Sequence, residues 1–190
     1  MKRKTHIKRF AAMAAVVLVL ALTFAGCSKG ESDSQGSDNF KSSLKKFKTT
    51  TLDGEKFTQD NLKDYDLTVV NIWSTGCGYC IDEMPALEKL KGQLPSNVQI
   101  VTICIDGEES PDTAKKVLAK QGLTAKTIVP SDSLNEGLLQ YVSGTPTTVF
   151  FDKNGKQVGE PKVGAFSTRD TDAVAELYLK EVNARLEKLS

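Results

Sequence analysis

The segment that decides the fold of this chain is Trp73-Ser74-Thr75-Gly76-Cys77-Gly78-Tyr79-Cys80. It follows an apolar run, Leu67 to Trp73, that predicts a buried strand, and it opens a pattern typical of a helix. The two cysteines are therefore expected where a strand gives way to a helix. Unpaired N–H groups and the macrodipole at a helix N-terminus lower the pKa of a cysteine there and favour its thiolate.

The spacing of the two cysteines favours redox chemistry. Two residues separate Cys77 from Cys80, so the second sulfur can return to the first and resolve a mixed disulfide with a substrate. We interpret Cys77 as the nucleophile and Cys80 as the resolving thiol. A zinc site would need two further ligands, whereas His6 lies in a leader and Cys27 and Cys104 stand alone. A purely structural bridge over so short a loop would stabilise the fold little. Cys104 lies inside an apolar run and is expected to be an inert core thiol.

A wider stretch, Asn71 to Pro85, resembles the active-site segment of the thioredoxin superfamily. Within that superfamily it is most similar to the membrane-tethered TlpA/ResA-type thiol-disulfide oxidoreductases. The resemblance extends from about Lys45 to the C-terminus. It implies an α/β, thioredoxin-like fold with a mixed central sheet flanked by helices. Residues 47–51 and 55–58 flank an Asp-Gly turn and predict a β-hairpin extension before that fold.

The resemblance assigns further residues to the site. Trp73 matches the tryptophan that precedes the cysteines, and Thr145-Pro146 matches the cis-proline loop that faces them. The main chain of Thr145 is expected to pair with an extended substrate peptide. Together with Gly78 and Tyr79, these residues form the predicted substrate-binding surface.

Glu83 matches a glutamate that ResA-type proteins keep beside the cysteines. A glutamate on the first turns of a helix is usually solvated, and a carboxylate is mildly favourable there in any case. The functional interpretation is that a partly buried Glu83 relays protons to Cys80. Thioredoxin itself carries a buried aspartate where this chain has Asn71, so Glu83 is the candidate proton acceptor. Because Gly78-Tyr79 replaces the Gly-Pro of thioredoxin, the redox potential does not carry over.

The N-terminus predicts export. Residues 1–26 hold five basic and no acidic residues, and residues 10–22 form an unbroken apolar run that is short for a membrane span. This is the pattern of a signal peptide. Phe24-Ala25-Gly26-Cys27 resembles a lipobox, which implies a lipid on Cys27. Cleavage by an ordinary signal peptidase and an uncleaved anchor are the alternatives.

The rest of the chain divides into two parts. Residues 27–44 are rich in serine, glycine and aspartate and predict a flexible, lipid-anchored linker. Residues 45–190 carry the strand and helix patterns of the thioredoxin-like domain. An Asn-Gly turn at 154–155 predicts a hairpin whose second strand covers residues 157–163. Residues 168–189 predict an amphipathic helix with Leu177 and Leu179 among its inward-facing residues. After the leader, 20 basic residues stand against 24 acidic ones, and this mildly acidic balance does not favour nucleic-acid binding.

These features together imply an extracytoplasmic enzyme on the outer face of the cell membrane. The resemblance implies a monomer without metal or cofactor, whose disulfide is reduced again by a CcdA-like membrane electron donor. Its expected substrates are disulfide-bearing envelope proteins, such as apocytochrome c or a methionine sulfoxide reductase. A disulfide-forming oxidant or isomerase of secreted proteins is the alternative within the same chemistry. A peroxiredoxin is disfavoured because Thr75 and Cys77 lack the spacing of a peroxidatic site, and a non-catalytic binding lipoprotein would tolerate Cys77→Ser.

Overall fold

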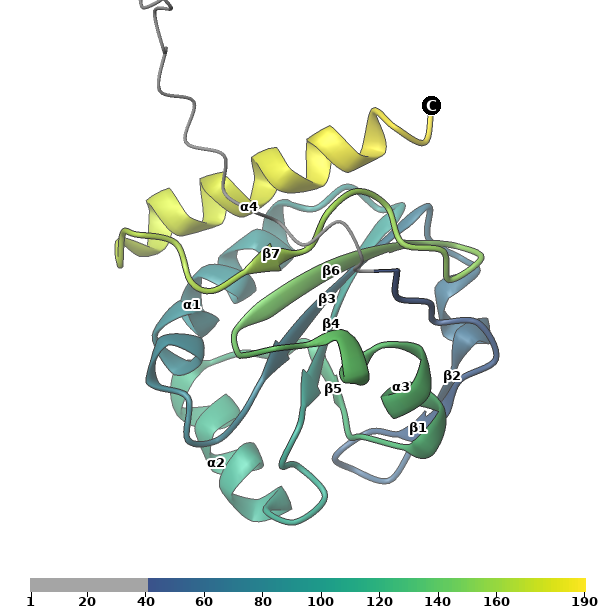
Figure 1. Cartoon of the computed structure of the whole chain (residues 1–190). Coiled ribbons are helices and arrows are strands. Elements are labelled where there is room, and N and C mark those ends of the chain that lie inside the picture. Colours follow the sequence, from purple (N-terminus) through teal and green to yellow (C-terminus); the bar gives the residue numbers. More distant parts are fainter. Residues whose placement is uncertain (1–40) are drawn as a thin grey trace, which may run out of the picture. The chain divides into compact units, whose positions relative to one another are not determined.

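A computed structural model of the chain describes residues 41–190 (Figure 1). The predicted signal peptide, the lipidation site Cys27 and nearly all of the predicted linker lie outside these residues. Within residues 41–190, no helix combines the length and apolar character needed to cross a membrane. Packing of the domain includes Ser42, whose main-chain N–H donates to the Gln157 side chain at 3.0 Å, and Leu44, which is buried. The packed region therefore begins slightly before the predicted boundary at Lys45.

A five-stranded mixed sheet, in the order β5-β4-β3-β6-β7, forms the centre of the domain. β3 runs parallel to β4 and antiparallel to β6, and β4 runs parallel to β5. The predicted buried strand is confirmed, since every residue of β3 is buried between layers that cover both faces of the sheet. The strands are β3 (Leu67–Trp73), β4 (Val98–Cys104), β5 (Lys126–Ile128), β6 (Thr147–Asp152) and β7 (Lys162–Val163).

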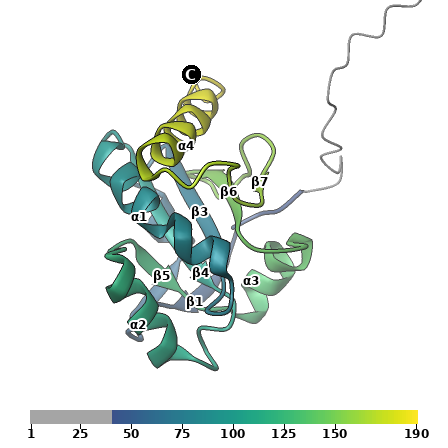
Figure 2. The ribbon, with the colours of Figure 1, turned by 90° about the vertical axis from the view of Figure 1, so that its left-hand side faces the viewer.

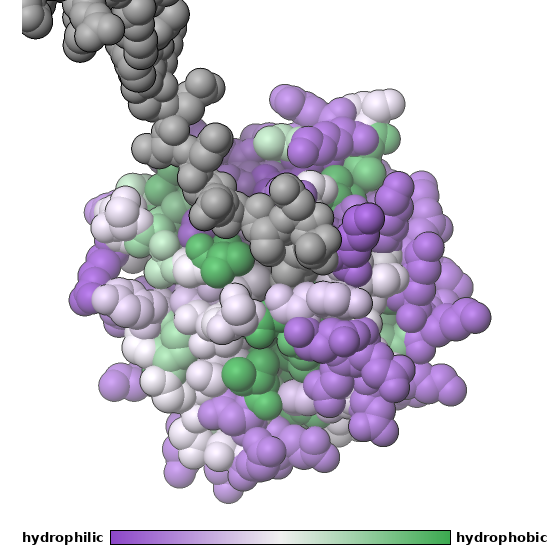
Figure 3. Space-filling view, in the orientation of Figure 1, coloured by the Kyte–Doolittle hydropathy of each residue, from purple (hydrophilic) through white to green (hydrophobic). Residues whose placement is uncertain are grey.

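Helices cover both faces of the sheet (Figure 2). One face carries α1 (Gly78–Gln93), α2 (Pro111–Gln121) and α4 (Thr171–Leu186). The other carries α3 (Asp132–Gly137), the 3-10 turns η1 (Gln59–Leu62) and η2 (Leu139–Tyr141), and an antiparallel hairpin of β1 (Lys48–Thr50) and β2 (Lys56–Thr58). The predicted thioredoxin-like α/β fold and its N-terminal hairpin are confirmed. The face of the domain seen in Figure 3 is mostly hydrophilic, with small hydrophobic areas between.

Alternation along β3 decides which side chains reach the active-site helix. Val69 and Trp73 pack in the core cluster beneath α1 and α4, whereas Val70 and Ile72 pack against the opposite layer. Since successive strand residues point to opposite faces, Asn71 shares the face of Val69 and Trp73. A polar amide is thereby buried beneath α1.

The second strand of the predicted Asn-Gly hairpin is shorter than expected. The sequence predicts a strand over residues 157–163, but the structure has an isolated bridge at Gln157 and then only the two residues of β7. Gly159 takes a left-handed backbone conformation, φ +71°, and Pro161 has no N–H to donate to a ladder. Both features interrupt the pairing.

The C-terminal helix also differs in detail from its prediction over residues 168–189. α4 begins at Thr171 because the Asp170 side chain caps it, accepting from the Ala173 N–H at 2.8 Å. Leu177 and Leu179, predicted to face inward, are only half-buried. The residue between them, Tyr178, is fully buried, and it belongs to the candidate active site.

Candidate active site

The two cysteines form a disulfide at the first turn of α1, with their Cα atoms 5.3 Å apart. Cys77 is the N-cap residue, and its Sγ accepts a hydrogen bond from the Cys80 N–H at 3.2 Å. Cys77 is half-buried, whereas Cys80 is 1% exposed. An approaching sulfur therefore meets Cys77 first, and the helix N-terminus favours the thiolate there.

An acidic residue at the end of β4 fastens the loop that leads to the dithiol. Asp106 accepts from the main-chain N–H of Thr75 at 3.0 Å and from the Thr75 hydroxyl at 2.5 Å. Burial alone would raise the pKa of Asp106, but these hydrogen bonds outweigh it and hold the pKa below its usual value. Asp106 was not predicted as a site residue, although an acidic side chain just after a buried strand was the available signal.

Cys104 behaves as the expected core thiol. It is fully buried and free, and its Sγ donates to Asp106 Oδ1 at 3.2 Å. Burial raises the pKa of Cys104 far above its usual value, and the neighbouring Asp106 carboxylate raises it further. The thiol is therefore unreactive in the folded protein.

Glu83 lies one helical turn after Cys80 and is only 5% exposed. Its Oε1 accepts from the Asn71 side-chain amide at 2.9 Å, and its Oε2 accepts from the Tyr178 hydroxyl at 3.1 Å. Burial raises the pKa of Glu83 to about 7, although these two hydrogen bonds and the charge of Lys162 oppose the shift. A carboxyl group with this pKa can exchange a proton near neutral pH.

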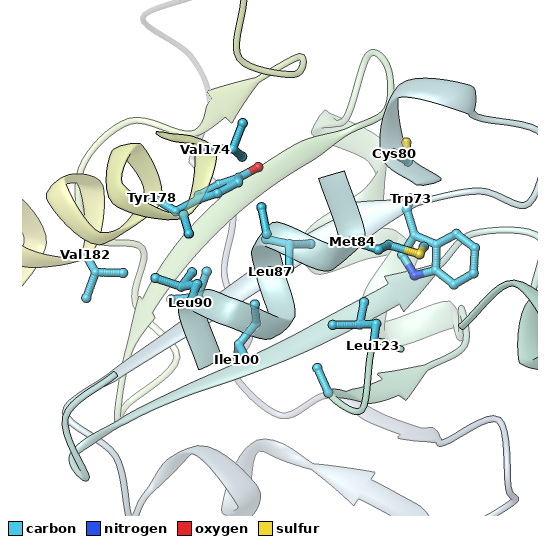
Figure 4. Packing of buried hydrophobic residues seen from close by; sticks show 14 of the residues in the cluster. Trp73, Cys80, Met84, Leu87, Leu90, Ile100, Leu123, Val174, Tyr178 and Val182 are labelled. Atoms are coloured by element: carbon cyan, nitrogen blue, oxygen red, sulfur yellow. The ribbon is translucent and has the colours of Figure 1, made fainter. Parts of the chain in front are cut away.

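Two more hydrogen bonds close a ring of four side chains, of which Glu83 is one. The Asn71 amide also donates to Thr148 Oγ1 at 3.0 Å, and the hydroxyls of Thr148 and Tyr178 lie 3.3 Å apart. The ring draws on β3, α1, β6 and α4, and Figure 4 shows Tyr178 reaching from α4 into the packed layer around α1. Tyr178 was not predicted to face inward, although its spacing of four residues from Val174 and from Val182 was an available signal, and nothing in the sequence indicated its partner.

The other predicted site residues lie near the C-terminal end of β3, where the chain leads into the dithiol. The Thr145–Pro146 peptide bond is cis, as predicted, and the next residue, Thr147, pairs with Ile72 in the sheet. The cis-proline loop therefore lies beside Trp73, where α1 begins. Trp73 itself is fully buried and donates from Nε1 to a threonine of β4, so it supports the site from within and offers no surface to a substrate.

Three exposed apolar or aromatic side chains lie around this end of the sheet. Tyr79, between the two cysteines, is 62% exposed, and Val163, whose strand pairs with Thr147, is 56% exposed. Ile105, bonded through its N–H to the Trp73 carbonyl, is 41% exposed. Exposed aromatic and aliphatic side chains of this kind are typical of protein-binding surfaces.

A cavity of about 270 Å³ lies beside Tyr79. Glu83 and Phe166 line it, and so do Asp82 and Arg169, whose side chains form an ion pair at 3.5 Å. The Arg169 guanidinium also stands 5.6 Å from the centre of the Tyr79 ring. The cavity therefore extends from the surface beside Tyr79 to Glu83, which is otherwise buried.

Known proteins resemble this chain in sequence and in fold. The chain matches the Redoxin family over residues 39–178. It is 26% identical to the thioredoxin-like protein YneN of Bacillus subtilis, over 69% of this chain and 75% of that protein. It is 31% identical to the thiol-disulfide oxidoreductase ResA of Bacillus thuringiensis subsp. konkukian, over 72% of this chain and 74% of that protein.

Solved structures give the same fold. A DsbF homologue from Corynebacterium diphtheriae superposes with a TM-score of 0.62 at 18% identity, covering 82% of this chain and 96% of that one. A thiol:disulfide interchange protein from Chlorobium tepidum gives a TM-score of 0.57 at 24% identity, covering 75% of this chain and 99% of that one.

The fold and the dithiol at the start of α1 define a thiol-disulfide oxidoreductase of the thioredoxin superfamily, of the TlpA/ResA type. The chain belongs to the Redoxin family.

Proposed function

We propose that this protein is an extracytoplasmic reductase of disulfides in envelope proteins, with Cys77 as nucleophile and Cys80 as resolving thiol. The observation that carries the assignment of roles is the difference in exposure between the two sulfurs: Cys77 is half-buried at the helix N-terminus, and Cys80 is buried behind it. The exposed side chains of Tyr79 and Val163 favour a protein substrate over a small molecule.

The cycle takes two exchange steps. The Cys77 thiolate attacks a substrate disulfide, forms a mixed disulfide and releases the first substrate sulfur as a thiolate. Cys80 then gives its proton to the Glu83 carboxylate, and the Cys80 thiolate attacks Cys77 Sγ. The second substrate sulfur leaves as a thiolate, and the Cys77–Cys80 disulfide of the structure is the product.

The buried carboxyl group favours the reducing direction. A negative charge on Glu83 next to Cys80 disfavours a cysteine thiolate, and whatever disfavours the thiolate disfavours the reduced form of the pair. The dithiol then passes its electrons on more readily. In this proposal, a CcdA-like membrane carrier restores the dithiol, and a lipid on Cys27 holds the enzyme at the outer face of the membrane. Labelling with radioactive lipid precursor that marks the native chain but not Cys27→Ser supports the anchor, and an unmarked native chain refutes it.

Trapping of mixed disulfides tests the proposal. Cys80→Ser lacks the resolving thiol, so substrates accumulate on Cys77 when the variant is expressed in its native envelope. Cys77→Ser, in which the attacking thiol is lost, is the matched control. Recurrent capture of one or two proteins, such as an apocytochrome c or a methionine sulfoxide reductase, supports a dedicated reductase. A broad range of secreted proteins supports instead the oxidant or isomerase function and overturns the reductase.

A further inference from the structure

The hydrogen atoms in the ring around Glu83 can be assigned one by one. The Asn71 amide gives one N–H to Glu83 Oε1 and the other to Thr148 Oγ1. When Glu83 is ionised, its Oε2 requires a donor, so the Tyr178 hydroxyl donates to it. The Thr148 hydroxyl then donates to the Tyr178 oxygen. Each hydroxyl in the ring both donates and accepts.

Protonation of Glu83 reverses one side of the ring. With a proton on Oε2, this oxygen becomes a donor and the Tyr178 oxygen accepts. The Tyr178 hydrogen turns to Thr148 Oγ1, which has a second lone pair free for it, and the Thr148 hydrogen turns out of the ring. Asn71 keeps both of its hydrogen bonds. The oxygen separations of 3.1 Å and 3.3 Å serve either direction, so no heavy atom has to move.

We infer that Tyr178 and Thr148 are positioning residues that hold Glu83 in place in both of its charge states, while it takes the Cys80 proton and passes it on. The inference rests on the proton-acceptor role given to Glu83 in the proposed function. The transfer leaves Cys80 as a thiolate and Glu83 as a neutral acid. The cavity beside Tyr79, which Glu83 lines, gives the proton a route to solvent, where the departing substrate thiolate takes it up.

Among the charged groups nearby, Lys162 acts on Glu83 through its charge. Lys162 on β7 is half-buried, with its ammonium 4.4 Å from the centre of the Phe166 ring, and its charge favours the Glu83 carboxylate. Glu181 on α4 acts electrostatically on Lys162, and the Asp82–Arg169 ion pair stands at the rim of the cavity. Within residues 41–190, only the side chains of Asn71 and Tyr178 donate hydrogen bonds to the Glu83 carboxyl group.

Two conservative variants test the inference because they act in opposite directions. Tyr178→Phe removes the donor to the ionised carboxylate, so the Glu83 pKa rises by about one pH unit, a tenfold change in protonation. Thr148→Val breaks the Thr148–Tyr178 hydrogen bond in both charge states. The ionised state then lacks only a donor to the Tyr178 oxygen, whereas the protonated state leaves the buried Tyr178 hydrogen without an acceptor, so the pKa of Glu83 falls, by about half a unit. Tyr65→Phe, a change to a half-buried tyrosine outside the ring, is the matched control and leaves the pKa unchanged.

The measurement is a ¹³C NMR titration of the glutamate carboxyl carbons in the purified full chain, with the Glu83 signal identified by its loss in Glu83→Gln. Opposite shifts in the two variants support the inference, and shifts of the same sign, or none, overturn it. If Tyr178→Phe does not fold, the nearly isosteric Thr148→Val decides by itself: a downward shift supports the inference and no shift overturns it.

A second readout separates this inference from the proposed function. The pH dependence of the resolving step, measured by rapid mixing, moves with the NMR midpoint in each variant if the ring serves proton transfer. A pH profile that stays fixed while the midpoint moves overturns the role in transfer. Disulfide exchange that survives Cys77→Ser would instead overturn the proposed function and leave the titration result standing.

Discussion

Glu83→Gln is expected to change how the stability of the protein depends on pH. The folded state raises the Glu83 pKa from 4.5 to about 7, because the carboxyl group is buried. Between these two pH values the unfolded chain has lost the proton and the folded chain still holds it, so the free energy of unfolding falls as the pH rises. At about 1.4 kcal/mol per pH unit, the loss by pH 8.5 amounts to about 3 kcal/mol.

Glutamine removes this loss because it resembles the neutral acid. Its side-chain oxygen accepts from Asn71, and its amide N–H donates to the Tyr178 oxygen. We therefore expect the variant to be about as stable as the native protein at pH 4 and more stable at pH 8.5, by about 3 kcal/mol. Urea denaturation of the two oxidised proteins at both pH values measures the difference.

Glu88→Gln on the same helix is the matched control, and its effect on stability at high pH is expected to be the opposite. Burial would raise the Glu88 pKa, but hydrogen bonds from Thr124 outweigh it and lower the pKa. The stability that this carboxylate contributes is present above its unfolded pKa and is lost as the pH falls through its folded pKa. The variant should therefore be the less stable protein at pH 8.5. A stability difference between native protein and Glu83→Gln that is the same at both pH values would refute the account of Glu83.

Three further predictions follow from the site. Asp106→Ala should lower the free energy of unfolding by about 2 kcal/mol and speed amide hydrogen exchange at Thr75. Asp106→Asn keeps one acceptor, so both effects should be smaller. Equal effects of the two variants in urea denaturation and hydrogen exchange would contradict this role of Asp106. Iodoacetamide should label Cys104 only after unfolding, because burial raises the pKa of this thiol. Labelling of Cys104 in the native protein, detected by mass spectrometry, would contradict its burial. Tyr79→Ala should slow the reduction of a protein disulfide at least fivefold more than that of glutathione disulfide in stopped-flow assays, and equal slowing would exclude Tyr79 as a protein contact.

The parts of the fold that the sequence predicted are those with strong local patterns. The predominantly apolar segment of β3 and the Cys-x-x-Cys that follows it place the strand, the helix and the dithiol without knowledge of any distant contact. The Thr145-Pro146 loop was predicted only through the resemblance. β7 was predicted too long because the prediction followed the Asn-Gly turn signal and did not weigh the effects of Gly159 and Pro161 on strand pairing.

The contacts that define the chemistry of the site join residues far apart in the chain. Tyr178 lies 95 positions after Glu83, and the sequence pattern did not mark it as an inward-facing position of its helix. Burial of Glu83 likewise depends on how α4 packs over α1. Asp106 reaches Thr75 because β3 and β4 are parallel neighbours, a pairing that was not predicted from the sequence. Tertiary packing decides these contacts, and local pattern does not encode them.

The most direct test of the account uses purified Cys80→Ser and Cys77→Ser with a disulfide-bonded peptide. We predict that Cys80→Ser stops after one exchange, releasing one equivalent of peptide thiol and carrying the other half on Cys77, located by peptide mapping. Cys77→Ser should form no adduct, because its remaining active-site sulfur is buried. An adduct on Cys80 in Cys77→Ser, formed as fast as that on Cys77, would contradict the assignment of attacking and resolving thiols.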